Sequence, residues 1–231
     1  KLYSVCLPSE NTYQIGDRAF AGCSWLQIVC SYPLKLRISQ LGEYAFSGCS
    51  VLEHSSNQLI FTEDLDEIPE GAFKDCKYLF NSLVIPQTVR YIGSYAFSGV
   101  GRLSAISLPD NVEVGPYGVF ANTGLTSISI PSSWTEIGDD FFNGCTRLAS
   151  VSVPEGVVRI GDRAFEGCTG LSSVSLPQSL LTIGEGCFRN CSSLGAVVIP
   201  SRITHLSYGT FAGCSSLSGV TLPEGLVSIS S

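Results

Sequence analysis

Hydrophobic and polar positions along this chain follow one pattern that recurs throughout. A phenylalanine, usually preceded by alanine, marks the register of the pattern, and it returns at intervals of 26, 27, 24, 23, 22, 23, 23 and 23 residues. A fixed period in this range is typical of a solenoid, in which each repeat buries its apolar face only by stacking on its neighbours. The nine register phenylalanines are Phe20, Phe46, Phe73, Phe97, Phe120, Phe142, Phe165, Phe188 and Phe211.

One half of each repeat predicts a short β-strand. Between Leu171 and Leu176 apolar and polar residues alternate, with Ser173 and Ser175 on the polar side. Such alternation places one face of a strand in the core and the other in solvent. Pro177 ends the strand, because proline has no N–H to donate to a ladder.

The other half of each repeat predicts one or two helical or 3₁₀ turns. Ala164, Phe165 and Cys168 are spaced i, i+1 and i+4, which brings them to one face of a helix. An acid lies three residues before the register phenylalanine in six repeats, where the N–H groups of a first helical turn favour negative charge. These acids are Asp17, Glu43, Glu70, Asp139, Asp162 and Glu185.

The position before this acid is glycine in six repeats and Pro69, Pro116 or Ser207 in the other three. Because proline fixes φ near about −65°, the position does not require a positive φ. A first helical position suits both glycine and proline, so we expect it here. The glycines are Gly16, Gly42, Gly93, Gly138, Gly161 and Gly184.

These motifs resemble the BspA-like leucine-rich repeat, also called the Treponema-type repeat. The resemblance rests on Leu-x-x-Val-x-Leu-Pro, Ile-Gly-x-x-Ala-Phe and Gly-Cys at 23-residue spacing, and it covers nearly the whole chain. It implies a leucine-rich-repeat solenoid of about ten 23-residue repeats. In this fold a curved right-handed coil carries one parallel β-sheet on its concave side and short helical or 3₁₀ turns opposite. It also implies an extracellular or cell-surface protein of bacteria or protists, associated with adhesion and host-protein binding.

The repeats predict one continuous domain over residues 1–231, irregular in residues 1–80 and regular in residues 81–231. The chain opens and closes within strand patterns, and neither end carries the amphipathic cap that a solenoid needs. It also contains no methionine. We therefore expect a fragment of a longer protein.

Charge and hydropathy narrow the classes of partner. The formal net charge is −7 and the pI is near 4.8, which argues against nucleic acid because phosphate binding needs a basic stripe. No apolar run approaches the ~18 residues that span a bilayer. We expect a protein or glycan partner, with no nucleic acid and no membrane span.

Seven of the ten cysteines lie three residues after the register phenylalanine. Val100 and Thr123 take this position in two further repeats, and Cys187 replaces the alanine of one Ala-Phe pair. Exchange with small apolar residues favours buried thiols over disulfides or a metal site. The seven are Cys23, Cys49, Cys76, Cys145, Cys168, Cys191 and Cys214.

The chain shows no catalytic motif. Its two histidines, His54 and His205, lie in no Ser/His/Asp or Cys/His arrangement, and no phosphate loop or metal motif occurs. We predict a protein that is not an enzyme and needs no cofactor or metal. An acidic stretch is interpreted as a solvated loop, with a Ca²⁺ site as the alternative; its acids are Glu63, Asp64, Asp66, Glu67 and Glu70.

The outward strand positions supply the candidate binding surface. In the regular repeats they are small and uncharged, and they are expected to line the concave face. Trp134, after Pro131-Ser132-Ser133, is a second candidate at a loop edge, with edge packing as the alternative. The candidates on the concave face are Ser127, Ser129, Ser150, Ser152, Ser173 and Ser175.

We predict a non-catalytic cell-surface or secreted protein-interaction module that acts in adhesion or host-protein binding through the solenoid surface. Two other functions stay open. A structural spacer that projects another domain fits the bland serine face. A targeting domain fits an enzyme whose catalytic part lies outside this sequence.

Overall fold

A computed structural model describes residues 1–7, 11–30, 35–52 and 58–230. These residues form about nine coil turns built from parallel strands, one fewer than expected, in two compact units. The first unit, residues 1–115, holds the turns of Phe20 to Phe97, and the second, residues 116–231, holds those of Phe120 to Phe211. The predicted solenoid of parallel strands is confirmed. His54 lies outside the described residues.

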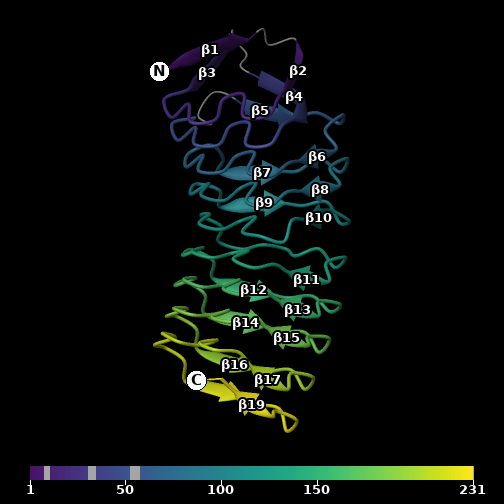
Figure 1. Ribbon diagram of the computed structural model, residues 1–231, viewed down its shortest axis with the longest axis vertical. Helices are drawn as coiled ribbons and strands as arrows, with labels where there is room; N and C mark the ends of the chain where they lie inside the picture. Colours follow the sequence, from purple (N-terminus) through teal and green to yellow (C-terminus); the bar gives the residue numbers. More distant parts are fainter. Residues whose placement is uncertain (8–10, 31–34, 53–57, 231) are drawn as a thin grey trace. The chain divides into compact units, whose positions relative to one another are not determined.

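The second unit carries two rows of strands (Figure 1). Where neighbouring strands of a row pair, they are parallel with partners 23 residues apart, such as Ser150 with Ser173 and Arg159 with Thr182; β14 and β16 do not pair, nor do β15 and β17. The first row has three-residue strands: β12 (Ser150–Ser152), β14 (Ser173–Ser175), β16 (Ala196–Val198) and β18 (Gly219–Thr221). The second row has two-residue strands: β11 (Glu136–Ile137), β13 (Arg159–Ile160), β15 (Thr182–Ile183), β17 (His205–Leu206) and β19 (Ser228–Ile229).

The first unit is less regular. Its sheets are β1–β3, β2–β4–β5, β6–β8–β10 and β7–β9, all parallel. The longest strand is β4, which pairs with both β2 and β5. The strands are β1 (Ser4–Leu7), β2 (Thr12–Ile15), β3 (Gln27–Cys30), β4 (Lys35–Leu41), β5 (Gln58–Phe61), β6 (Glu67–Ile68), β7 (Ser82–Val84), β8 (Tyr91–Ile92), β9 (Ala105–Ser107) and β10 (Glu113–Val114).

The second row of strands corrects the expectation of a single sheet. Four of its five strands, all except β19, place one outward residue before one buried aliphatic residue, as in Arg159 and Ile160. Two residues are too few to show an alternating pattern, so the sequence signal for a strand is missing. The first row was predicted correctly: β14 exposes Ser173 and Ser175 and turns Val174 inward.

The expected helical turns are also corrected. Among the described residues there is no α-helix and no 3₁₀-helix; the segments around the register phenylalanines are overlapping β-turns. In all nine turns, the residues two before and two after the phenylalanine have positive φ, for example Arg163 at 52° and Gly167 at 70°. Residues in this left-handed region interrupt a helix. The amide of Cys168 therefore closes a turn onto Phe165 O (3.1 Å), whereas the amide of Phe165 donates to Cys187 O of the next turn (2.9 Å).

Close packing between turns explains the glycine column. A Cβ on Gly161 would come within 3.0 Å of the backbone of Gly138 and Asp139 in the preceding turn. The prediction of no positive φ is confirmed, but the first helical position is wrong. In each unit, one non-glycine residue of this column follows a strand that does not pair with the equivalent strand of the preceding turn. Pro69 follows β6, which does not pair with β4, and Ser207 follows β17, which does not pair with β15.

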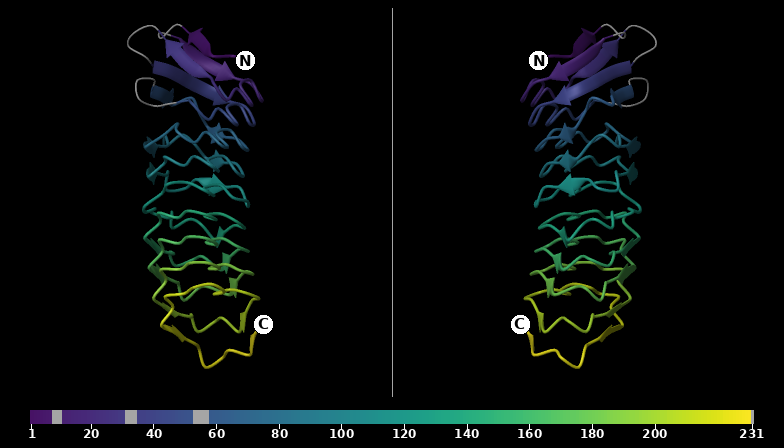
Figure 2. Two further views of the ribbon diagram at one scale, coloured as in Figure 1. Left: turned by 90° about the vertical axis from the view of Figure 1, so that its left-hand side faces the viewer. Right: turned by 90° about the vertical axis from the view of Figure 1, so that its right-hand side faces the viewer.

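The predicted core is confirmed. The register phenylalanines stack from turn to turn, with ring centroids 5.3 Å apart for Phe142 and Phe165 and 5.4 Å apart for Phe165 and Phe188. All are fully buried except Phe20 and Phe211, which are half-buried. In side view the turns of each unit lie as parallel rungs (Figure 2).

Candidate functional site

The first strand row of the second unit is small and uncharged. Ser150, Ser152, Ser173 and Ser175 are exposed on β12 and β14, and their hydroxyl groups bond to no other described residue. Ser127 and Ser129 are also exposed, but the segment that holds them is not a strand. The sheet therefore presents four of the six predicted residues as one in-register patch.

Trp134 is buried. Only 5% of the residue is exposed, and its ring packs edge-on against Phe141, with centroids 5.4 Å apart. This is the edge-packing alternative that the sequence left open. A side chain with so little surface offers no contact to a partner, so Trp134 plays a structural part in its turn.

The second strand row of this unit differs in charge. Its outward residues are Glu136, Arg159, Thr182 and His205, in successive turns. The residue that follows each of them is buried. This row was not predicted as a strand row or as a binding surface, although the residue before the buried aliphatic position varies from turn to turn in the sequence.

Acids beside the second row connect successive turns. Asp139 Oδ1 accepts a hydrogen bond from the backbone N–H of Asp162 (3.0 Å), and Asp162 Oδ1 accepts one from the N–H of Glu185 (2.8 Å). In the first unit Asp17 does the same for Glu43 (2.9 Å). These carboxylates therefore cap the amides of the next turn, and the expected role at a helix N-terminus is wrong.

Arg159 bridges the second row and the acids. Its Nη2 donates to Asp139 Oδ1 (2.6 Å), and its Nη1 lies 3.6 Å from Glu136 Oε2. Partial burial alone would lower the pKa of Arg159, but the hydrogen bond and charge of Asp139, with the charge of Glu136, raise it above its usual value. The guanidinium is thus held across the surface in a fixed position.

An open groove of about 430 Å³ lies beside Arg159, around Thr182. Ile183, Gly184 and Asp162 are among the residues that line it. Leu181 adds an exposed aliphatic surface, and 43% of that residue is accessible. The lining therefore combines the aliphatic surface of Leu181 with a carboxylate.

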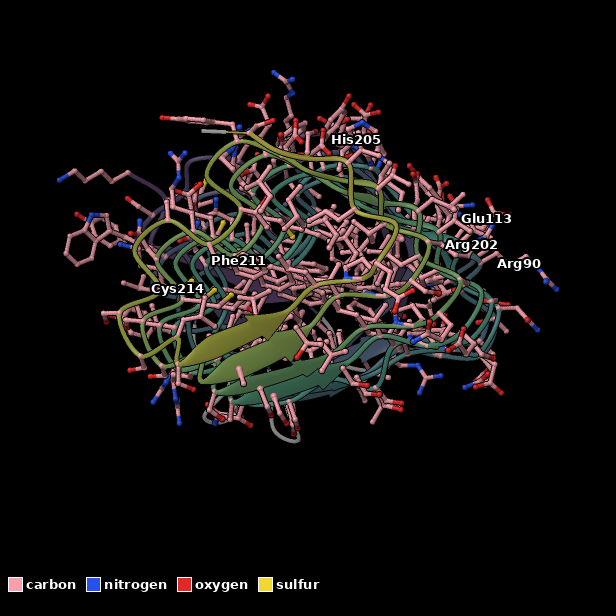
Figure 3. The ribbon with its side chains drawn as sticks, turned by 90° about the horizontal axis from the view of Figure 1, so that it is seen from below. Arg90, Glu113, Arg202, His205, Phe211 and Cys214 are labelled. Carbon is pink, nitrogen blue, oxygen red and sulfur yellow. The ribbon has the colours of Figure 1, made fainter. Side chains whose placement is uncertain are left out.

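His205 lies at the groove on the side of the next turn. It is exposed at the outer surface, whereas Phe211 and Cys214 point toward the interior (Figure 3). Its Nδ1 lies 2.7 Å from the hydroxyl oxygen of Thr204, which fixes the orientation of the ring. The hydroxyl beside the imidazole is that of Thr204, and both residues are exposed at the surface.

The cysteine column lies away from both strand rows. Eight cysteines are free thiols in the described residues, in agreement with the predicted buried column. Each of six column thiols also donates to the carbonyl of the register phenylalanine one turn earlier; Cys168, for example, donates to Phe142 O (3.2 Å). Burial raises the pKa of Cys145 to about 11 and that of Cys191 to about 12. Thiols held protonated in this way are poor nucleophiles.

Two classes of site are not found in the described part of the chain. No group of three or more His, Cys, Asp or Glu side chains there is placed to hold a metal ion. No helix there is long and apolar enough to cross a membrane. The acids Glu63, Asp64, Asp66, Glu67 and Glu70 are all exposed.

Comparison with known proteins defines the family. The model of the BspA type leucine rich repeat region matches residues 1–116 and 115–231, with six copies of the repeat. The chain therefore belongs to the BspA-type leucine-rich repeat family, as the sequence motifs indicated.

Solved bacterial structures share the fold. A leucine rich cell surface protein from Faecalibacterium prausnitzii A2-165 is 30% identical, with a TM-score of 0.68 over 99% of this chain and 69% of that protein. A leucine-rich repeat protein from Bacteroides ovatus is 25% identical, with a TM-score of 0.68 over 96% and 67% of the two chains. The leucine rich repeat protein of T. pallidum is 27% identical, with a TM-score of 0.52 over 84% and 78%. None of the curated proteins matches this chain.

Proposed function

We propose that this chain is a non-catalytic protein-interaction module of a cell-surface or secreted protein. The observation that supports this most is the in-register patch of Ser150, Ser152, Ser173 and Ser175. Their hydroxyl groups are exposed on paired strands and form no hydrogen bond to other described residues. A preformed surface of this kind binds with little ordering cost. The name of the Faecalibacterium protein, a leucine rich cell surface protein, supports the location.

The partner is a protein or a glycan, and adhesion is the process that this location favours. The acidic net charge of −7 disfavours nucleic acid. The family is generally built from repeat modules without catalytic activity, which supports a binding role over an enzymatic one.

Binding to immobilised extracellular-matrix proteins and to a glycan array tests this function. The variant S152R/S175R places two positive charges on the first strand row. Its matched control, S193R/S216R, adds the same charge at exposed positions on the turn side of the same unit. Binding that is lost in S152R/S175R and kept in the control supports the proposal.

Two other outcomes count against it. Binding that both variants retain would move recognition away from the serine patch. No binding to either panel would contradict the interaction function and favour a structural spacer, which the small, uncharged surface also suits.

A further inference from the structure

The groove beside Thr182 arises where the repeat departs from its own pattern. In β13, Arg159 reaches across the surface to Asp139 of the preceding turn, at 2.6 Å. The equivalent residues 23 positions later are Thr182 and Asp162, and Thr182 is the register partner of Arg159 in the ladder. Threonine is too short to make this bridge, so the position of the guanidinium is open beside Asp162.

A second departure from the repeat pattern, at Ser207, lies on the side of the groove that belongs to the next turn. Ser207 stands in the glycine column, where close packing leaves no room for a Cβ in regular turns. In those turns a glycine amide bonds to the second row, as Gly184 N–H does to Ile160 O (2.8 Å). At Ser207 the hydroxyl group instead donates to Ile183 O (2.7 Å), and β15 and β17 do not pair. The turn of Ser207 is thus set apart from β15, and both line the groove.

The charges around the groove favour a cation. The carboxylates of Glu136, Asp139, Asp162 and Glu185 follow this side of the unit, against the guanidinium groups of Arg159 and Arg163, so acids outnumber cations there. Asp139 Oδ1 accepts two hydrogen bonds, one from the backbone N–H of Asp162 in the next turn and one from the guanidinium of Arg159. Asp162 Oδ1 accepts a hydrogen bond from the corresponding amide, that of Glu185. Among the described residues no guanidinium forms a hydrogen bond or ion pair with Asp162, although Arg159 and Arg163 act on it electrostatically.

We propose that this groove binds an arginine side chain of a protein partner, placed at Asp162 as Arg159 is placed at Asp139. The inference rests on the proposed interaction function and names the chemistry of the partner. The methylene groups of the arginine would cover the exposed side of Leu181, and its planar guanidinium would bond to the carboxylate. Lysine offers a compact charge without this planar geometry and fits less well.

The direct test is an NMR titration of the intact chain with N-acetyl-arginine amide, followed through backbone amide shifts. We expect shifts at Thr182, Ile183, Gly184 and His205, with a dissociation constant in the millimolar range for a single residue. N-acetyl-citrulline amide has nearly the same shape without the charge, and it should cause no comparable shifts.

Three variants sharpen the test. T182R supplies the missing guanidinium from the chain itself and should abolish the shifts caused by arginine amide. S193R adds the same charge at an exposed position on the turn side, and it should leave the titration unchanged. D162N keeps an acceptor for the amide of Glu185 but removes the charge, and it should weaken binding about three- to tenfold.

The proposal is overturned if arginine amide causes no shifts around Thr182, if citrulline amide causes the same shifts, or if T182R and S193R respond alike. This result is independent of the test of the serine patch. A chain that binds arginine amide but captures no matrix protein or glycan would keep the groove assignment and count against the interaction function alone.

Discussion

In the second unit, the buried phenylalanine column and the outer second row differ in how far their residues repeat from turn to turn. The phenylalanine column holds the same residue in every turn, because each ring meets the same neighbours one turn away. The second row instead presents Glu136, Arg159, Thr182 and His205 in succession, on strands whose inner residues are all aliphatic. Repetition therefore maintains the fold, and departure from repetition creates the groove. Stability should depend on the columns, and the proposed binding of an arginine side chain on the second row.

The largest expected effect is a cavity in the phenylalanine column. Phe165 is fully buried between two other rings, so F165A should lower the free energy of unfolding by about 3–5 kcal/mol. Phe211 is half-buried and stacks on one ring in this unit, so F211A should cost less, about 1–2 kcal/mol. Chemical denaturation of both variants measures the difference. Equal losses would contradict the idea that position within the stack sets the cost.

The next effect concerns close packing between turns. G161A introduces a Cβ within 3.0 Å of the preceding backbone and should destabilise the protein by about 1–3 kcal/mol. Gly219 is the control, because a Cβ there would meet nothing within 4 Å and its φ is not positive. G219A should be neutral or slightly stabilising. Similar melting temperatures for the two variants would refute steric exclusion as the reason for the glycine column.

The thiol column predicts loss of stability at alkaline pH. Burial raises the folded-state pKa of Cys145 to about 11 and of Cys191 to about 12, above the value of about 8.5 for an unfolded thiol. Above pH ~8.5 the unfolded chain loses these protons while the folded chain keeps them. Stability is therefore complete below that pH and falls as pH rises, by at most about 1.4 kcal/mol per thiol for each pH unit.

Thermal unfolding between pH 8 and pH 10.5 measures this slope. The variant C145V/C191V uses the residue that Val100 already places in the column, and it should show a shallower decline. The same slope in the variant and the parent chain would assign the effect to other groups, such as Tyr44, whose hydrogen bond to Glu70 raises its pKa to about 12.

The sequence predicted the buried phenylalanine and cysteine columns better than it predicted the second strand row. Phe165 and Cys168 recur in register, and the alternation around Ser173 marked the first-row strand, so the core and one sheet followed directly. The turns were misjudged because the left-handed position two residues before the phenylalanine holds residues as different as Arg163, Tyr95 and Gly186. The position two residues after it holds only glycine, asparagine or aspartate, the residues that favour this region, but that signal was not used. An apparent helical spacing was then the stronger signal.

The groove could not be predicted, because it depends on single departures whose meaning appears only with the fold. Thr182 in place of Arg159 is unremarkable until the partner of Arg159 is known to be Asp139. Ser207 in place of glycine matters only because the turns approach closely in that column. Both residues were visible in the sequence, but the contact that each one changes was not.

The smallest effect should come from the row itself. Arg159 pairs with Asp139 and Glu136, but its side chain is 40% exposed, so solvent and salt screen the interaction. R159A should therefore lower stability by only about 0.5–1 kcal/mol, and by less at high salt. Denaturation at two salt concentrations measures this, with R147A as the control at an exposed arginine. A loss comparable to that of F165A would show that the row supports the fold, and it would remove the separation between columns that stabilise and a row that is free to bind.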